Sequence, residues 1–199
     1  MNFDPQGPVR KAAAQRASAL HRTANFILFQ AGWFACVLGA ASGDTLAIAG
    51  TAAAILVVAI HIGSARRAMP ELKLALVVTL IGLLWEALVL QAGWLAFPYG
   101  NLTGGWPPIW ILAMWALLAT TLNVSLDWLK GRWLLAVVLG AVAGPLSYYA
   151  GMRMGAVEFI DAPRAIATLA VGWGALTPLL LLLAHRLDGV TGLAGAQSP

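Results

Sequence analysis

Residues Leu72–Leu95 read LKLALVVTLIGLLWEALVLQAGWL, an apolar run in which Glu86 is the only acidic residue. An α-helix rises about 1.5 Å per residue, so about 20 residues cross the roughly 30 Å hydrocarbon core of a bilayer. The run is therefore long enough to form a transmembrane helix.

Five more apolar runs lie elsewhere in the chain: Asn25–Ala41, Thr45–Gly63, Pro107–Leu126, Trp133–Met152 and Ala165–Ala184. The chain is 60% hydrophobic and 10% charged, whereas soluble domains carry about 25% charged residues. Six spans with short connections use most of the 199 residues and leave no room for a separate soluble catalytic domain. The sequence therefore predicts one all-α domain over residues 23–186, a polytopic bundle of six transmembrane helices.

The positions of the basic residues predict the orientation of this bundle. With six spans, ten of the twelve Lys and Arg residues fall on one side: Arg10, Lys11, Arg16, Arg22, Arg66, Arg67, Lys73, Lys130, Arg132 and Arg186. Only Arg153 and Arg164 fall on the other side. The positive-inside rule then places both termini in the cytoplasm, and we expect a protein of the bacterial inner membrane.

The two ends of the chain lie outside the predicted bundle. Residues 1–22 are predicted to form a basic cytoplasmic arm, and residues 187–199, rich in Gly and small residues, a disordered tail. An alternative makes the first apolar run a cleavable signal, because a basic arm, an apolar stretch and the small residues of 39–43 resemble one.

Glu86 is the outstanding candidate for chemistry, because it is the only acidic residue deep inside an apolar run. A charge at that depth costs several kcal/mol unless it is paired or protonated. Thr79, Gly82 and Gly93 share its helical face, which predicts that Glu86 points toward other helices. It is either a proton carrier, a general acid or base or a cation ligand, or else a protonated carboxyl that holds the bundle in register.

A second group of polar residues is predicted near the cytoplasmic side. Asn123 follows small residues along one face of the fourth run, His61 lies near the end of the second run, and Gln30 enters the first run at similar depth. Together they predict a polar pocket for a ligand. The alternative is that they only form hydrogen bonds between adjacent helices.

A third group lies toward the outer side. Tyr148, Tyr149 and Arg153 bring hydroxyls and a positive charge near the outer interface, and Gln91 lies near the end of the third run. We take them as candidate ligand-binding residues. Arg153 could reach Glu86, bind a lipid phosphate, or pair with an acidic residue of the next loop. Before them, Gly140 and Gly144 predict a close helix contact.

Several function classes are not supported by the sequence. It contains no phosphate-binding loop, dinucleotide fingerprint, His-Glu-x-x-His motif or nucleophile elbow, and its single cysteine, Cys36, excludes a multi-cysteine metal site. One His with carboxylates at different depths lacks the ligand pairs of metal sites in helical bundles. We expect no metal, no cofactor and no nucleic acid, and membrane lipids or other membrane proteins as partners.

Longer stretches of the chain resemble a known family. They are Asn25, Phe29, Gln30, Gly32, Trp33 and Phe34 with CVLGA at 36–40; Pro108–Trp110, Trp115, Ala119–Leu122, Ser125, Leu126, Trp128 and Leu129; and GPLSYYAG at 144–151 with Gly155 and Ala156. These stretches resemble an uncharacterised family of small bacterial inner-membrane proteins, domain of unknown function 2878.

This resemblance implies an integral inner-membrane protein, with relatives encoded near enzymes that modify unsaturated or cyclopropane fatty acids. It implies no catalytic residues. The arm before Arg22 and the tail after Leu187 lie outside the shared part.

Three functional hypotheses follow. The first is a lipid-associated protein that binds or moves an apolar ligand, such as an acyl chain, within the bundle. The second is a membrane-embedded enzyme of fatty-acid or lipid modification with Glu86 as acid or base. The third is a structural or assembly subunit of a membrane complex, in which the polar residues only pack helices.

Overall fold

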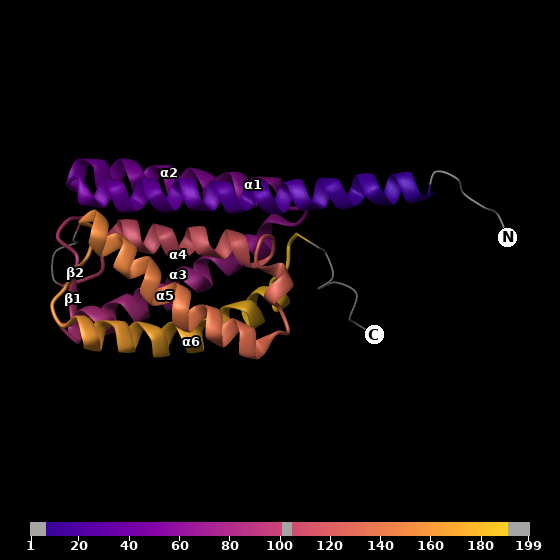
Figure 1. Ribbon diagram of the computed structural model, residues 1–199. Helices are drawn as coiled ribbons and strands as arrows, with labels where there is room; N and C mark the ends of the chain where they lie inside the picture. The colour runs from indigo at the N-terminus through magenta and orange to yellow at the C-terminus, as the bar shows by residue number, and fades with distance from the viewer. Residues whose placement is uncertain (1–6, 101–104, 191–199) are drawn as a thin grey trace.

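The computed structural model describes residues 7–100 and 105–190, with side chains from Ser18 onward. Six α-helices form one antiparallel bundle, and a two-stranded ribbon joins two of their connections (Figure 1). The helices are α1 (Gly7–Ala41), α2 (Asp44–Ser64), α3 (Ala68–Gln91), α4 (Ile109–Leu122), α5 (Trp133–Met154) and α6 (Ala162–Arg186), with a 3₁₀ turn, η1 (Asp127–Leu129). The strands are β1 (Leu95–Ala96) and β2 (Glu158–Phe159).

Five of these helices are long and apolar enough to cross a membrane, with α1 contributing residues Ser18–Ala41. The prediction of an all-helical membrane protein is confirmed at this level. The fourth predicted span, Pro107–Leu126, is helical only over Ile109–Leu122. Its fourteen residues rise about 21 Å, less than the roughly 30 Å of a hydrocarbon core.

Helix α4 is short because its helical pattern is interrupted at both ends. Pro108 takes the N-cap position with extended backbone, and tight turns follow Asn123. Nine of the fourteen residues of α4 are buried. The helix lies in the interior, in contact with α1, α2 and α3. Its apolar side chains therefore pack in the core of the bundle.

The bundle has two distinct ends (Figure 1). At one end, antiparallel pairing of Leu95 with Phe159 and of Ala96 with Glu158 forms the ribbon, which we call the ribbon end. At the other end lie the α2–α3 connection with Arg66 and Arg67, the turn before α5, and the end of α6. We call this the basic end. The first turns of α1 extend beyond it, and successive helices run in opposite directions between the two ends.

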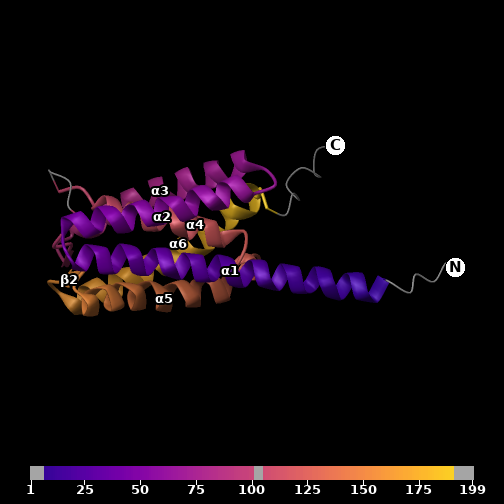
Figure 2. The same ribbon diagram turned by 90° about the horizontal axis from the view of Figure 1, so that it is seen from above.

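Two pairs of helices pack most closely, while α4 is surrounded by α1, α2 and α3. Helix α1 packs mainly on α2, and α5 packs mainly on α6, as the view from above also shows (Figure 2). A Cβ atom at Gly140 would lie 2.2 Å from the Trp173 carbonyl oxygen, and one at Gly144 would lie 2.2 Å from the Trp173 ring. The predicted Gly140/Gly144 contact is therefore the α5–α6 interface. By contrast, α1 and α5 share few contacts.

Candidate functional site

Glu86 lies at a point where three helices meet, and its side chain is fully buried. It is on α3, and its Oε1 atom accepts a hydrogen bond of 2.9 Å from the Trp115 indole nitrogen on α4. The same oxygen accepts a hydrogen bond from the Tyr148 hydroxyl on α5. The inward orientation that the sequence predicts for Glu86 is therefore present, and the structure joins two of the predicted site residues, Glu86 and Tyr148.

Gly82 makes this geometry possible. It lies one turn before Glu86 on α3, and a Cβ atom there would come within 2.2 Å of the Trp115 ring. Only glycine leaves room for the indole to lie across α3 and donate to Glu86. The ring is also held from the other side, because Trp173 of α6 stacks on it with ring centroids 4.8 Å apart.

Two further indoles complete this group, which we call the Glu86 cluster: Glu86, Trp115, Tyr148, Trp85 and Trp173. The indole N–H groups of Trp85 and Trp173 lie near the Tyr148 hydroxyl. Neither N–H group donates a hydrogen bond within the described part of the chain, and the second carboxyl oxygen of Glu86 also has no partner there. The cluster thus gathers hydrogen-bond donors around one buried carboxyl and leaves some of its N–H and oxygen atoms without partners. Burying such atoms without a hydrogen bond costs free energy in apolar surroundings.

A cavity of about 510 Å³ lies against this cluster, between α1 and α4 on one side and α5 and α6 on the other. Tyr148, Trp115 and Trp173 form part of its wall, while Glu86 lies behind them. Most of the remaining wall is apolar. We call it the lateral cleft.

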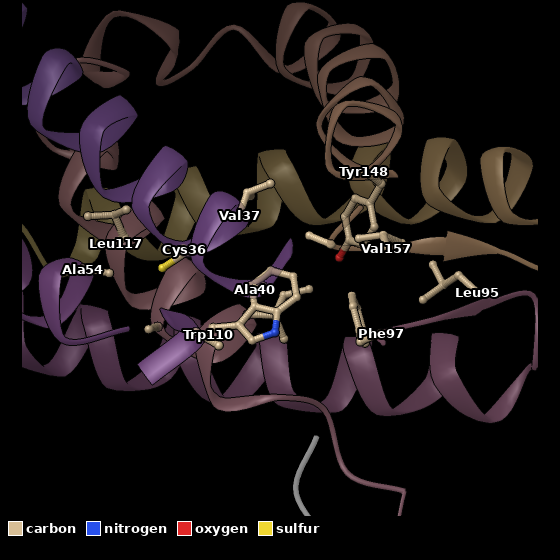
Figure 3. Close-up of a cluster of buried hydrophobic side chains, with 14 of the residues drawn as sticks. Cys36, Val37, Ala40, Ala54, Leu95, Phe97, Trp110, Leu117, Tyr148 and Val157 are labelled. Atoms are coloured by element: carbon tan, nitrogen blue, oxygen red, sulfur yellow. The ribbon is translucent and has the colours of Figure 1, made fainter. Parts of the chain in front are cut away.

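The lateral cleft opens at the side of the bundle. Its wall includes Leu146 of α5, which is 59% exposed, and the exposed Ala143 and Leu139 on the same helix. From Leu139 to Gly151 the α5 wall extends about 18 Å along the helix axis. In the interior view, Tyr148 points from α5 toward Val157 and the apolar core (Figure 3).

A second buried carboxyl, Glu71, organises the basic end. One of its oxygens accepts hydrogen bonds from the Asn123 amide, at 2.8 Å, and from the Gly189 backbone N–H, at 2.7 Å. The other oxygen lies 2.9 Å from His61 Nε2. His61 and Asn123, which the sequence places in one polar pocket, therefore both contact Glu71, which lies between them. We call these four residues the Glu71 cluster.

Two basic residues near the Glu71 cluster also hold the chain that follows α6. Arg67 donates from its guanidinium to the Asp188 carbonyl oxygen and from its backbone to that of Gly189. Lys130 forms an ion pair of 3.3 Å with the Asp188 carboxylate. Residues 187–190 thus have defined partners, although they belong to the segment predicted as disordered; residues 191–199 lie outside the described part.

Sequence reasoning missed Glu71 for an identifiable reason. The third apolar run was taken to begin at Leu72, so Glu71 was left in a connection, whereas α3 begins at Ala68 and Glu71 lies in its first turn. The signal was present in the two predicted polar residues, His61 and Asn123. Both face inward and need an acceptor or donor between them.

The remaining predicted site residues lie apart from both clusters. Gln30 is partly buried and lines the lateral cleft. Tyr149 is 46% exposed, and Gln91 and Arg153 are exposed near the ribbon end. Asp161 pairs with Arg164 at 3.3 Å, and among the described residues Arg153 forms no ion pair. Its predicted contacts with Glu86 or the next loop are thus not formed.

The structure offers no metal centre in the part of the chain that it describes. In residues 7–100 and 105–190, no group of three or more His, Cys, Asp or Glu side chains is placed to hold an ion. Cys36 is fully buried between α1 and α2, and its sulfur lies 3.4 Å from the Gly50 carbonyl oxygen. It packs as a small interior residue.

These features define a helical bundle with several membrane-length helices, a buried carboxyl cluster and a cleft at its side. Residues 22–179 match the family described as "Protein of unknown function (DUF2878)", and the chain belongs to this family. The resemblance seen in the sequence is therefore confirmed, and the match leaves out the arm before Arg22. No curated protein and no solved structure matches the chain.

Proposed function

We propose that this protein is a lipid-associated, multi-pass protein of the bacterial inner membrane that binds an acyl chain in the lateral cleft. The observation that carries the proposal is the cleft itself, about 510 Å³ of mostly apolar space that opens at the side of the bundle. Cavities that hold small molecules typically measure about 300–1,000 Å³ and are lined mainly by apolar side chains.

The membrane placement is part of the proposal. In this placement each of the six helices provides one crossing, and α4 needs its flanking segments to complete the fourth. Basic residues gather at the end that holds the start of α1 and the end of α6, while Arg153 and Arg164 lie near the opposite end. The positive-inside rule then favours six crossings with both termini in the cytoplasm.

In a bilayer, the side of the bundle faces acyl chains. Water in an apolar cleft at that depth would lose hydrogen bonds without replacement, whereas a lipid chain restores dispersion contacts along the wall. The cleft extends along α5 for about 18 Å, a length suited to an extended chain. Tyr148 and Trp115 would then face the chain at one side of the cleft.

A pair of neighbouring substitutions on α5 tests this proposal. Ala143→Phe places a ring in the cleft, whereas Val142→Phe adds a ring at a residue that is 53% exposed and does not line it. We expect a long-chain fatty acid carrying a diazirine to label the wild type and the Val142 variant. Labelling of the Ala143 variant should fall severalfold. Equal labelling of all three proteins would contradict binding in the cleft.

A second candidate is an enzyme that modifies the bound chain with Glu86 as acid or base. The observation that favours it is Tyr148, which lines the cleft and also donates to Glu86. A deletion strain complemented with wild type, Glu86→Gln or Tyr148→Phe would test it by the acyl composition of its lipids. An unchanged composition across these strains, with the proteins equally abundant, would remove this candidate.

A further inference from the structure

A second cavity lies at the basic end, and Leu129 lines both this cavity and the lateral cleft. It measures about 310 Å³ and lies between the turn that enters α5 and the last turns of α6. Lys130, Arg132 and Trp133 line it from the turn, and Leu181, Leu182 and His185 line it from α6. We call it the basic cavity.

The charges around the basic cavity are unevenly compensated. Lys130 is ion-paired with Asp127 at 2.8 Å and with Asp188 at 3.3 Å. Arg132 instead lies over the Trp128 ring, 5.7 Å from its centroid, and has no carboxylate partner among the described residues. A guanidinium stacked on an indole keeps its N–H donors free at its edge. Arg132 is therefore the cation of the cavity lining that no described carboxylate compensates.

The other side of the basic cavity is apolar. Ala136 and Leu181 are buried in its floor, and Trp133 at its rim is 52% exposed. Tryptophan is enriched where a bilayer meets water, because its ring is apolar and its N–H is polar. A cavity with a cationic rim and an apolar floor at this level complements a ligand with an anionic head and an apolar tail.

We propose that the basic cavity binds the phosphate group of an anionic phospholipid from the leaflet at the basic end, with Arg132 as its principal donor. Arginine recognises phosphate through parallel N–H donors, and a pocket between helices holds the headgroup in a way that a flat surface does not. The proposal uses the membrane placement given above but is independent of acyl-chain binding in the lateral cleft.

Lipid binding to the purified full-length protein, followed by native mass spectrometry, tests this site. The probes are phosphatidylglycerol and phosphatidylcholine with the same acyl chains. We expect phosphatidylglycerol to bind more tightly, and Arg132→Gln to weaken its binding about tenfold or more, as for loss of a charge-assisted hydrogen bond. Phosphatidylcholine carries the same phosphodiester but also a choline cation, which the charge of Arg132 repels, so its affinity should be lower and should fall less in Arg132→Gln.

Arg186→Gln is the matched control, because it removes the same charge at the same end from a residue that does not line the cavity. A screened charge outside the cavity should change the affinity by less than about threefold. Equal losses in the Arg132 and Arg186 variants would overturn the proposal in favour of general surface attraction. Arg132→Lys, which keeps the charge, should recover part of the binding.

Two further measurements separate the alternatives. If inorganic phosphate alone binds with the same dependence on Arg132 while phosphatidylglycerol shows no preference over phosphatidylcholine, the ligand is a free anion and the lipid assignment is wrong. The free energy of unfolding of Arg132→Gln in mixed micelles with sodium dodecyl sulfate should equal that of the wild type. If it is lower, the variant has altered the whole bundle, and Arg132→Lys then decides: phosphatidylglycerol binding stronger than in Arg132→Gln supports the site, and binding as weak as in Arg132→Gln overturns it.

Discussion

Replacing Glu86 by leucine or by glutamine tests how this carboxyl holds the bundle. Leucine leaves the Trp115 N–H and the Tyr148 hydroxyl without their shared acceptor. Each buried donor without a partner costs about 1–3 kcal/mol, so Glu86→Leu should lower the free energy of unfolding by about 2–6 kcal/mol. Glutamine keeps a carbonyl oxygen for both donors, and its amide takes the place of the oxygen that already lacks a partner. Its cost should be near the roughly 0.6 kcal/mol typical of a hydrogen bond between membrane helices.

Unfolding in mixed micelles with increasing sodium dodecyl sulfate, followed by tryptophan fluorescence and circular dichroism, measures both variants against the wild type. A double-mutant cycle with Tyr148→Phe isolates the coupling between the two side chains. If Glu86→Gln is as unstable as Glu86→Leu, the reasoning is refuted. The oxygen that accepts from Trp115 and Tyr148 would then not account for the contribution of Glu86 to the free energy of unfolding. If the glutamine variant is stable, its lipid phenotype can be interpreted without a folding defect.

Two other substitutions test the packing and the basic end. Gly82→Ala should destabilise the bundle by about 1–3 kcal/mol in the same unfolding assay, because its Cβ would meet the Trp115 ring. Gly63→Ala is the control and should be tolerated, because nothing lies within 4 Å of its Cβ. Equal losses of stability in the two variants would contradict the claim that Gly82 makes room for the Trp115 ring. Glu71→Ala should release Leu187–Val190 and raise their backbone hydrogen exchange, because it removes the acceptor for the Gly189 N–H; unchanged protection would show that other contacts hold the segment.

The sequence predicted most of the fold because membrane helices must satisfy their own backbone hydrogen bonds, so long apolar runs become helices. Five of the six predicted runs are helices of membrane length. The run Pro107–Leu126 was misjudged in length, because an interior helix is as apolar as a lipid-facing one and hydropathy does not separate them. What shortens α4 is backbone geometry, at Pro108 before it and in the turns after Asn123.

The site was predictable only in part. The inward orientation of Glu86 followed from the small and polar residues on its helical face, and Tyr148 could be named because it brings a hydroxyl near the outer interface. Their hydrogen bond depends on the rotation of α5 relative to α3, which helical periodicity within each run does not determine. Trp115 was named for the family resemblance but not for the site. It reaches Glu86 only because Gly82, on another helix, leaves room for its ring.

The two buried carboxyls differ in a way that bears on function. Both oxygens of Glu71 have partners, including the backbone N–H of Gly189 just after α6, so any ligand would have to displace structural hydrogen bonds. Glu86 uses one oxygen, lacks a described partner for the other, and reaches the lateral cleft through Tyr148. A side chain that binds a ligand needs a hydrogen-bonding atom that is not already paired within the protein. On that ground Glu71 is a structural residue of the basic end, and Glu86 with Tyr148 is where contact with a bound chain should be sought.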